Sequence, residues 1–208
     1  MSSYSPMPIV TDILRRVGLS GFRDLGPFIA AGPPLTNIVF STAVLSEVDL
    51  DEFIFVSSLA NVQSPYRPFL IRCLLAGNNT AKYVEGLRLA AQVGPSVQSL
   101  DYLGEAAMHN IYARFAFGMF LILCGSTDVG NRVLGTSLER FPSFPEAIVV
   151  AEQVCTQIRD MGTPGQHPYR RHRGISEIPE CRLVHFGALE VCPQCLALYY
   201  YFEISDLC

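Results

Sequence analysis

The chain has 208 residues, half of them apolar, which is long enough for one or two domains with a buried core. A charged fraction of 16% and a net charge of -4 argue against a disordered chain and against a general nucleic-acid binder, which would normally be basic. The longest apolar run, 115–124, is too short to cross a bilayer, and no basic region leads into an apolar segment at the start. Seven cysteines fit a reducing compartment better than a disulfide framework. We expect an intracellular protein, cytoplasmic or nuclear, with neither nucleic acid nor membrane as a partner.

The first expected element is a helical hairpin near the N-terminus. An apolar stripe with helical spacing runs along residues 7–17 and consists of Ile9, Ile13, Leu14 and Val17. Ser20 can cap a second helix that carries Phe22 and Leu25. At Pro33 and Pro34 a helix should break or restart, because neither residue can donate a backbone hydrogen bond. An ordinary amphipathic hairpin is the simpler interpretation of this stretch.

Residues 79–138 contain a sequence pattern that occurs twice. The Ala, the aromatic residue and the Gly of 81–86 return in 113–118 at a spacing of 32 residues. A period in the thirties is typical of stacked helical hairpins, here with helices near 79–92, 97–108, 110–124 and 128–138. The small residues that should let two helices approach closely are Ala81, Gly86, Ala113 and Gly118.

Further helices are expected on both sides of this repeat, at 69–76 and at 146–160, the second as a closing helix. Asn78-Asn79-Thr80 matches a glycosylation acceptor, but we interpret it as the turn that starts a helix. An acidic run is interpreted as a solvated face and consists of Glu47, Asp49, Asp51 and Glu52. No motif for a nucleophile, a phosphate loop or a metalloprotease occurs, so neither an enzyme nor a catalytic residue is expected.

The end of the chain is rich in cysteine. Cys192 and Cys195 form a Cys-x-x-Cys motif, which can bring two thiolates to one metal ion. Zinc normally needs two more ligands, which Cys208 could supply together with Cys181 or His185. A structural zinc site and free thiols on an apolar tail both remain open.

Several motifs resemble known families. Ile13-Leu14-x-Arg16-Val17, followed by Ser20-x-Phe22-Arg23-Asp24-Leu25, resembles the start of a plant-type F-box. The pattern Ala81-x-Tyr83-x-x-Gly86, with its return from Ala113 to Gly118, resembles Sel-like repeats, a branch of the tetratricopeptide class. In this order the motifs look like one group of plant F-box proteins with Sel-like repeats, whose chains end in a similar set of cysteines.

The resemblance implies an all-α fold: an F-box-like helical hairpin, a short Sel-like helical-repeat solenoid and a small irregular cysteine-containing tail. The expected segments are a divergent F-box at 1–53, a linker and entry helix at 54–78, the repeats with their closing helix at 79–160, and the loop and tail at 161–208.

The function implied by the resemblance is that of a non-enzymatic substrate-recognition adaptor in a Skp-cullin-F-box ubiquitin ligase. Residues 8–25 would dock on the Skp-type adaptor subunit, and the repeats or the tail would bind a protein target that the sequence does not name. The docking residues would be Pro8, Ile13, Leu14, Val17, Leu19, Phe22 and Leu25. The implied zinc ligands are Cys181, Cys192, Cys195 and Cys208, with His185 as a substitute. The alternatives are a helical-repeat interaction scaffold without ligase docking and a zinc-stabilised binding module.

Overall fold

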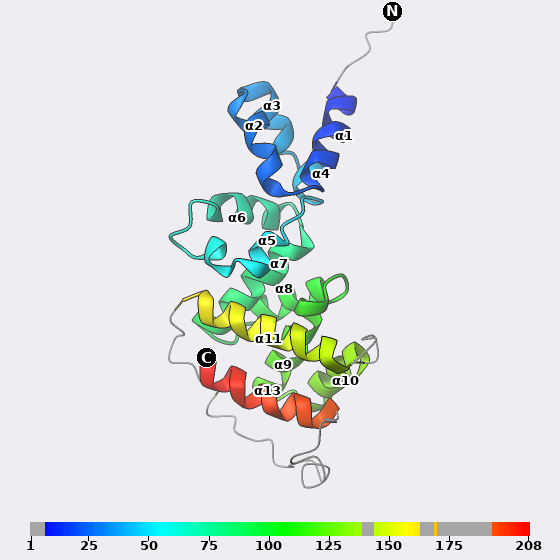
Figure 1. Cartoon of the computed structure of the whole chain (residues 1–208), viewed down its shortest axis with the longest axis vertical. Coiled ribbons are helices and arrows are strands. Elements are labelled where there is room, and N and C mark those ends of the chain that lie inside the picture. The colour runs from blue at the N-terminus through cyan, green and yellow to red at the C-terminus, as the bar shows by residue number, and fades with distance from the viewer. Residues whose placement is uncertain (1–6, 139–143, 163–168, 170–192) are drawn as a thin grey trace, which may run out of the picture. The chain divides into compact units, whose positions relative to one another are not determined.

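A computed structural model describes residues 7–138, 144–162, 169 and 193–208, and every regular element within these residues is helical (Figure 1). The all-α prediction is therefore confirmed for this part of the chain. The chain divides into two compact units, Met1–Val84 and Glu85–Cys208. The boundary falls inside α7 (Asn79–Arg88), so the expected segments 1–53 and 54–78 belong to one unit. No helix among the described residues combines the length and the apolar character needed to span a bilayer.

The first unit is a set of short helices. Their bounds are α1 (Met7–Gly18), η1 (Phe22–Leu25), α2 (Gly26–Ala30), α3 (Pro33–Val39), α4 (Thr42–Leu45), α5 (Glu52–Phe55), η2 (Ser57–Ala60) and α6 (Arg67–Leu75). α1 packs against η1, α3 and α4. Its core consists of apolar side chains that are almost fully buried, among them Leu14, Leu25, Val39, Leu45, Leu50 and Phe53. The hairpin predicted at the N-terminus is therefore part of a larger helical core.

α3 restarts where the two prolines predicted it. Gly32 precedes the helix with a φ of 109°, a conformation that glycine adopts without a Cβ clash, and Pro33 and Pro34 occupy the first turn. Thr36 Oγ1 donates to the carbonyl oxygens of Ile29 at 2.8 Å and Gly32 at 2.9 Å. These bonds tie the first turn of α3 back to the end of α2.

Asn78 starts α7. Its Oδ1 accepts a hydrogen bond from the Ala81 N–H at 3.1 Å, which satisfies one of the donors that a helix N-terminus leaves free. Its Nδ2 donates to the carbonyl oxygens of Leu45 at 3.1 Å and Val48 at 2.8 Å. Asn78 is buried, with 3% of its surface exposed. The interpretation of this sequon as a helix start is confirmed.

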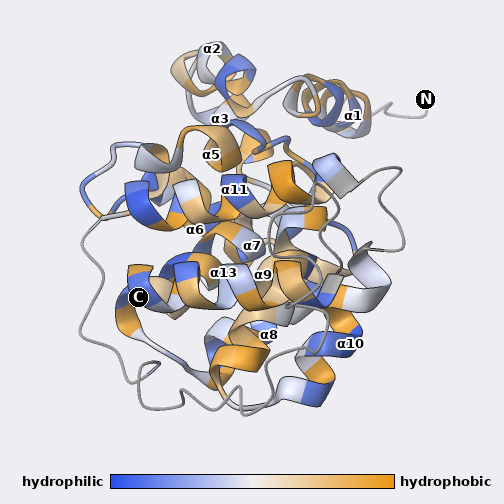
Figure 2. Ribbon diagram, turned by 60° about the horizontal axis from the view of Figure 1, so that its bottom comes forward, coloured by the Kyte–Doolittle hydropathy of each residue, from blue (hydrophilic) through white to orange (hydrophobic). Residues whose placement is uncertain are grey.

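The second unit contains the remaining helices. They are the end of α7, a π-helix η3 (Leu89–Val93), α8 (Val97–Ala107), α9 (Ile111–Leu123), α10 (Thr127–Leu138), α11 (Phe144–Asp160) and α13 (Pro193–Leu207). The predicted repeat helices and closing helix lie within a few residues of these bounds. α9 packs against α8, α10, α11 and α13 and is apolar around most of its circumference (Figure 2). A helix that is apolar all round is a core helix, and α9 is the centre of this unit.

The π-helix η3 exposes a carbonyl group that a distant tyrosine satisfies. The Gly94 N–H donates to the Leu89 carbonyl at 3.0 Å, and Pro95 has no N–H to offer Ala90. The Tyr169 hydroxyl donates to the Ala90 carbonyl at 2.9 Å, and its buried ring lies 5.7 Å from that of Phe120. This contact fixes a residue far along the chain to η3.

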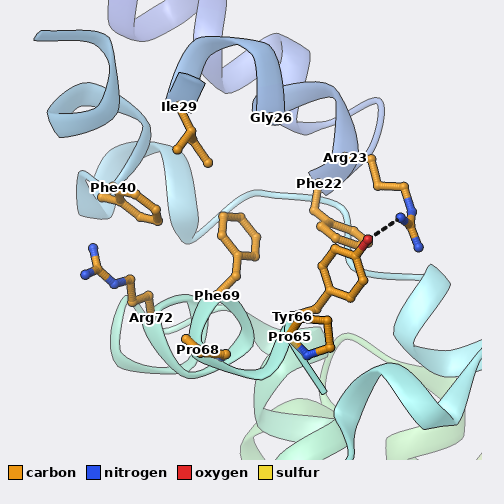
Figure 3. Close-up of a pocket in the computed structure, with 10 residues that line it drawn as sticks. All are labelled: Phe22, Arg23, Gly26, Ile29, Phe40, Pro65, Tyr66, Pro68, Phe69 and Arg72. Carbon is orange, nitrogen blue, oxygen red and sulfur yellow. Dashed lines mark hydrogen bonds between the residues drawn. The ribbon is translucent and has the colours of Figure 1, made fainter. Parts of the chain in front are cut away.

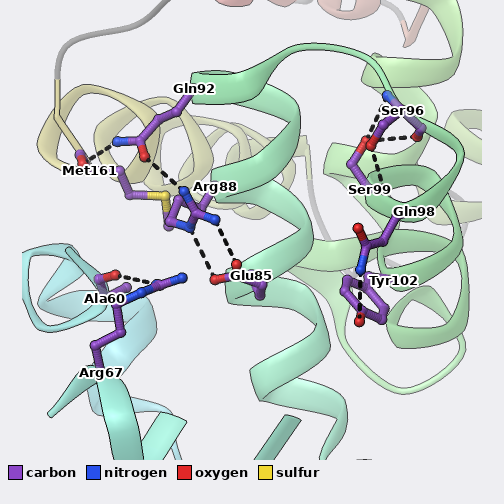
Figure 4. Close-up of polar contacts among 10 residues, drawn as sticks. All are labelled: Ala60, Arg67, Glu85, Arg88, Gln92, Ser96, Gln98, Ser99, Tyr102 and Met161. Atoms are coloured by element: carbon purple, nitrogen blue, oxygen red, sulfur yellow. Dashed lines mark hydrogen bonds and ion pairs between the residues drawn. The ribbon is translucent and has the colours of Figure 1, made fainter. Parts of the chain in front are cut away.

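A second contact to η3 comes from the end of α11. Gln92 Nε2 donates to the carbonyl oxygen of Met161, and Gln92 Oε1 accepts from Arg88 (Figure 4). Arg88 is held by Glu85 at 2.7 and 3.0 Å in a mostly buried ion pair. A side-chain network within the second unit therefore holds the end of α11 at η3.

The prediction of an irregular tail is wrong for residues 193–207, which form α13. Pro193 stands at the start, where its missing N–H costs nothing, and no glycine or proline interrupts the helix after it. α13 packs against α9, α10 and α11. Its buried apolar side chains are Leu196, Leu198, Tyr200, Tyr201 and Ile204. The Cys-x-x-Cys spacing led to the prediction of a metal site, although the apolar residues of this segment form a helix.

Candidate binding surfaces

The predicted small residues do lie at close helix contacts in both hairpins. A Cβ built on Gly86 would lie 3.1 Å from Leu103 Cγ in α8. A Cβ built on Gly118 would lie 2.8 Å from Leu134 Cγ in α10. In both hairpins a glycine of the first helix therefore packs against a leucine of the second helix, and the leucine side chain fills the space that a Cβ on the glycine would take. Ala81 and Ala113 are fully buried.

The two hairpins also share an asparagine helix cap, of which only the first, at Asn78, was predicted from the sequence. Asn110 Oδ1 accepts from the Ala113 N–H at 3.0 Å, as Asn78 Oδ1 does from the Ala81 N–H. Both asparagines stand three residues before the repeated alanine. This shared offset could have predicted both helix caps from the sequence, because asparagine is a preferred N-cap residue.

The residues predicted to dock on an adaptor fall into two groups. Leu14, Phe22 and Leu25 are buried in the first unit, where they hold the helices together. Pro8, Ile13 and Leu19 are exposed, and Val17 is half-buried. The seven residues therefore do not form one continuous surface.

Exposed apolar side chains extend along α1 and into the turn after it. About half of the surface of each is exposed: 56% for Met7, 51% for Ile9, 50% for Ile13 and 50% for Leu19. Ile9 and Ile13 stand one helical turn apart and lie outside the core, although the sequence stripe grouped them with Leu14. The exposed apolar surface of α1 is available for contact with another molecule.

Ion pairs flank this surface. Arg15 binds Asp12 at 2.9 Å and Glu47 at 2.8 Å, and Arg16 binds Asp12 at 3.0 Å. The hydrogen bond from Arg15 lowers the pKa of the Asp12 carboxyl. The predicted solvated acidic face is thus partly used inside the unit, since Glu47 accepts from an arginine of α1.

An aromatic groove in the first unit was not anticipated from the sequence. It has a volume of about 520 Å³ and is lined by aromatic rings and two arginines, namely Phe22, Phe40, Tyr66, Phe69, Arg23 and Arg72 (Figure 3). Arg23 binds both oxygens of Glu52 at 2.6 to 3.0 Å and donates to the Tyr66 hydroxyl at 2.8 Å. The Glu52 pKa is lowered by the hydrogen bonds from Arg23.

The structure does not bring the predicted zinc ligands Cys195 and Cys208 together. Cys195 lies in the first turn of α13 and Cys208 follows its last residue, so the helical rise separates them by about 20 Å. Ligands of one zinc ion lie only a few ångströms apart. Cys181, His185 and Cys192 lie outside the described residues, and no group of three metal-binding side chains occurs within the described part.

Comparisons with protein-family models, with curated proteins and with solved structures gave no match for this chain.

Proposed function

We propose that the chain is a non-enzymatic adaptor whose N-terminal unit docks on a Skp-type subunit of a cullin ubiquitin ligase, while its repeat hairpins or C-terminal part bind a target protein. The exposed apolar surface of α1 carries this proposal, together with the resemblance of residues 8–25 to an F-box. A helix that leaves isoleucines half exposed at a spacing of one turn offers the apolar face that a partner helix or groove buries.

The buried and the exposed members of the predicted docking residues would have different roles. Leu14, Phe22 and Leu25 hold the first unit together, so that Ile13 and Leu19 are presented on a fixed frame. Docking would then bury Pro8, Ile13 and Leu19 against the adaptor. Each Leu or Ile side chain buried in this way contributes about 1.5 to 3 kcal/mol.

The experiment is a pull-down of the full chain with a purified Skp-type adaptor. The double variant Ile13→Asp with Leu19→Asp should lose binding, since both side chains are exposed and the core stays intact. Val97→Asp is the matched control, because Val97 is 78% exposed and lies in the second unit, at the start of α8. Equal melting temperatures of the three proteins would show that the folds are comparable.

A second candidate is a helical-repeat scaffold that holds other proteins without ligase docking. The close packing of Gly86 on Leu103 and of Gly118 on Leu134 supports it, because tightly packed hairpins present a rigid surface. Absence of adaptor binding by the unaltered chain would favour this candidate. Undiminished binding by the double variant would remove α1 as the docking surface.

A further inference from the structure

We propose that the aromatic groove of the N-terminal unit binds an extended peptide in which an acidic residue stands next to an apolar one. The rings follow one another in a row (Figure 3). Tyr66 and Phe22 are 5.5 Å apart between ring centroids, Phe22 and Phe69 are 5.9 Å apart, and Phe69 and Phe40 are 6.1 Å apart. A long, narrow apolar row of this kind suits an extended chain of about five residues. None of the residues that line this groove belongs to α1.

The aromatic faces are only partly covered. Phe40, Tyr66 and Phe69 are half-buried, and Phe22 closes the floor with 6% of its surface exposed. Ile29 points from α2 towards Phe69 (Figure 3). An apolar side chain of the peptide placed between Ile29 and Phe69 would be surrounded by apolar atoms, which supplies the hydrophobic part of binding.

The charges at the two ends of the groove differ. At one end Arg23 is neutralised by both oxygens of Glu52. At the other end the guanidinium of Arg72 lies over the Phe40 ring at 4.2 Å and is exposed. Within the described residues no carboxylate pairs with Arg72. A guanidinium held against a ring keeps its N–H edge available for two parallel bonds to a carboxylate, so this end selects an acidic residue.

Gly26 provides a way to block the groove. It lines the groove, and a Cβ built on it would meet no atom within 4 Å. Its φ of -54° is negative, so a larger residue needs no left-handed backbone, although a Cβ before Pro27 adds some steric cost in the helical region. Gly26→Leu should therefore fill the entrance, and a melting temperature equal to that of the unaltered chain would show that the unit stays folded.

The test is selection of a phage-displayed library of random dodecapeptides on the immobilised full chain. Enriched peptides should carry an acidic residue beside an apolar one. For a synthetic peptide of the enriched sequence, Arg72→Glu and Gly26→Leu should each weaken the Kd at least tenfold. Arg132→Glu is the charge control, because Arg132 is exposed on α10 with only a 3.4 Å bond to the Asp128 carbonyl. Binding by this control should equal that of the unaltered chain.

Three outcomes would overturn the proposal: no enrichment, enrichment of basic peptides, or equal binding by both groove variants. Titration with benzoate distinguishes a groove that binds small aromatic acids from one that binds peptides. If benzoate binds and loses affinity in Arg72→Glu while no peptide is enriched, the groove takes small aromatic acids and the peptide proposal fails. Adaptor binding should be unchanged in Arg72→Glu, so this test is independent of the docking experiment.

Discussion

Gly118 of α9 and Gly130 of α10 meet at a close helix contact, and the carbonyl oxygen of Gly118 leaves no room for a methyl group on Gly130. A Cβ built on Gly130 would lie 2.6 Å from the carbonyl oxygen of Gly118 and 2.5 Å from Ile122 Cγ1. The first hairpin has no such pair, since Ser99 occupies the place of Gly130 at the offset of 31 residues that relates Leu103 of α8 to Leu134 of α10. α9 and α10 therefore approach each other through two glycines, one of which the repeat pattern did not reveal.

Gly130→Ala should destabilise the second unit by about 1 to 3 kcal/mol, because the added methyl group pushes α10 away from the backbone of α9. Urea unfolding followed by circular dichroism measures this change. Gly135→Ala is the control: a Cβ on Gly135 meets nothing within 4 Å, and alanine is the better helix former. That control should be neutral or up to about 1 kcal/mol more stable. Equal behaviour of the two variants would contradict the close contact.

Asn78→Ala should cost more stability than Asn110→Ala. Both changes remove a helix cap, which costs about 1 kcal/mol. Asn78→Ala also leaves the buried carbonyl groups of Leu45 and Val48 without their donor, which adds about 1 to 3 kcal/mol. Chemical unfolding of both variants gives the difference, and a larger loss for Asn110→Ala would refute the structural role assigned to Asn78.

Tyr169→Phe should destabilise the second unit, because the Ala90 carbonyl loses its donor and Pro95 cannot replace it. The expected cost is about 1 to 3 kcal/mol. Tyr199→Phe serves as the control, since Tyr199 is 56% exposed. Thermal unfolding of the two variants tests the contact, and the prediction fails if Tyr169→Phe melts at the temperature of the unaltered chain.

Alkaline pH should weaken the fold through its buried thiols. Burial raises the pKa of Cys73, Cys155 and Cys208 from 9.0 to about 12. Between these values the unfolded thiol loses its proton while the folded one keeps it, so the unfolded state binds fewer protons and stability falls as pH rises above 9. Each thiol contributes at most about 1.4 kcal/mol per pH unit.

The thiol prediction is checked by measuring the free energy of unfolding at intervals from pH 8 to pH 11. Replacing Cys155 by Ala should make the decline less steep, because one ionising group is removed. A decline of the same slope in this variant would assign the effect to other groups. Well below pH 9 the thiols are protonated in both states and should make no contribution to the pH dependence.

The helices between residues 79 and 160 could be predicted well from local sequence patterns. Apolar periodicity, the positions of the small residues and the glycine turns are local or repeated signals, and they predicted α8, α9, α10 and α11 within a few residues. The restart at Pro33 followed from the missing backbone donor. Residues 193–207 were predicted less well, because the Cys-x-x-Cys spacing suggested an irregular metal site in place of a buried helix.

The sequence by itself determined that this chain is helical and that its middle contains two hairpins with small residues at the contacts, because these properties depend on neighbours three to four residues away or on a repeated register. Only the tertiary structure decided which apolar residues of α1 are core and which are surface, because helical spacing cannot tell what covers a face. It also assembled the aromatic groove from residues between 22 and 72. Long-range packing also decides which arginine is paired. Arg23 forms an ion pair with Glu52, whereas within the described residues Arg72 has no carboxylate partner.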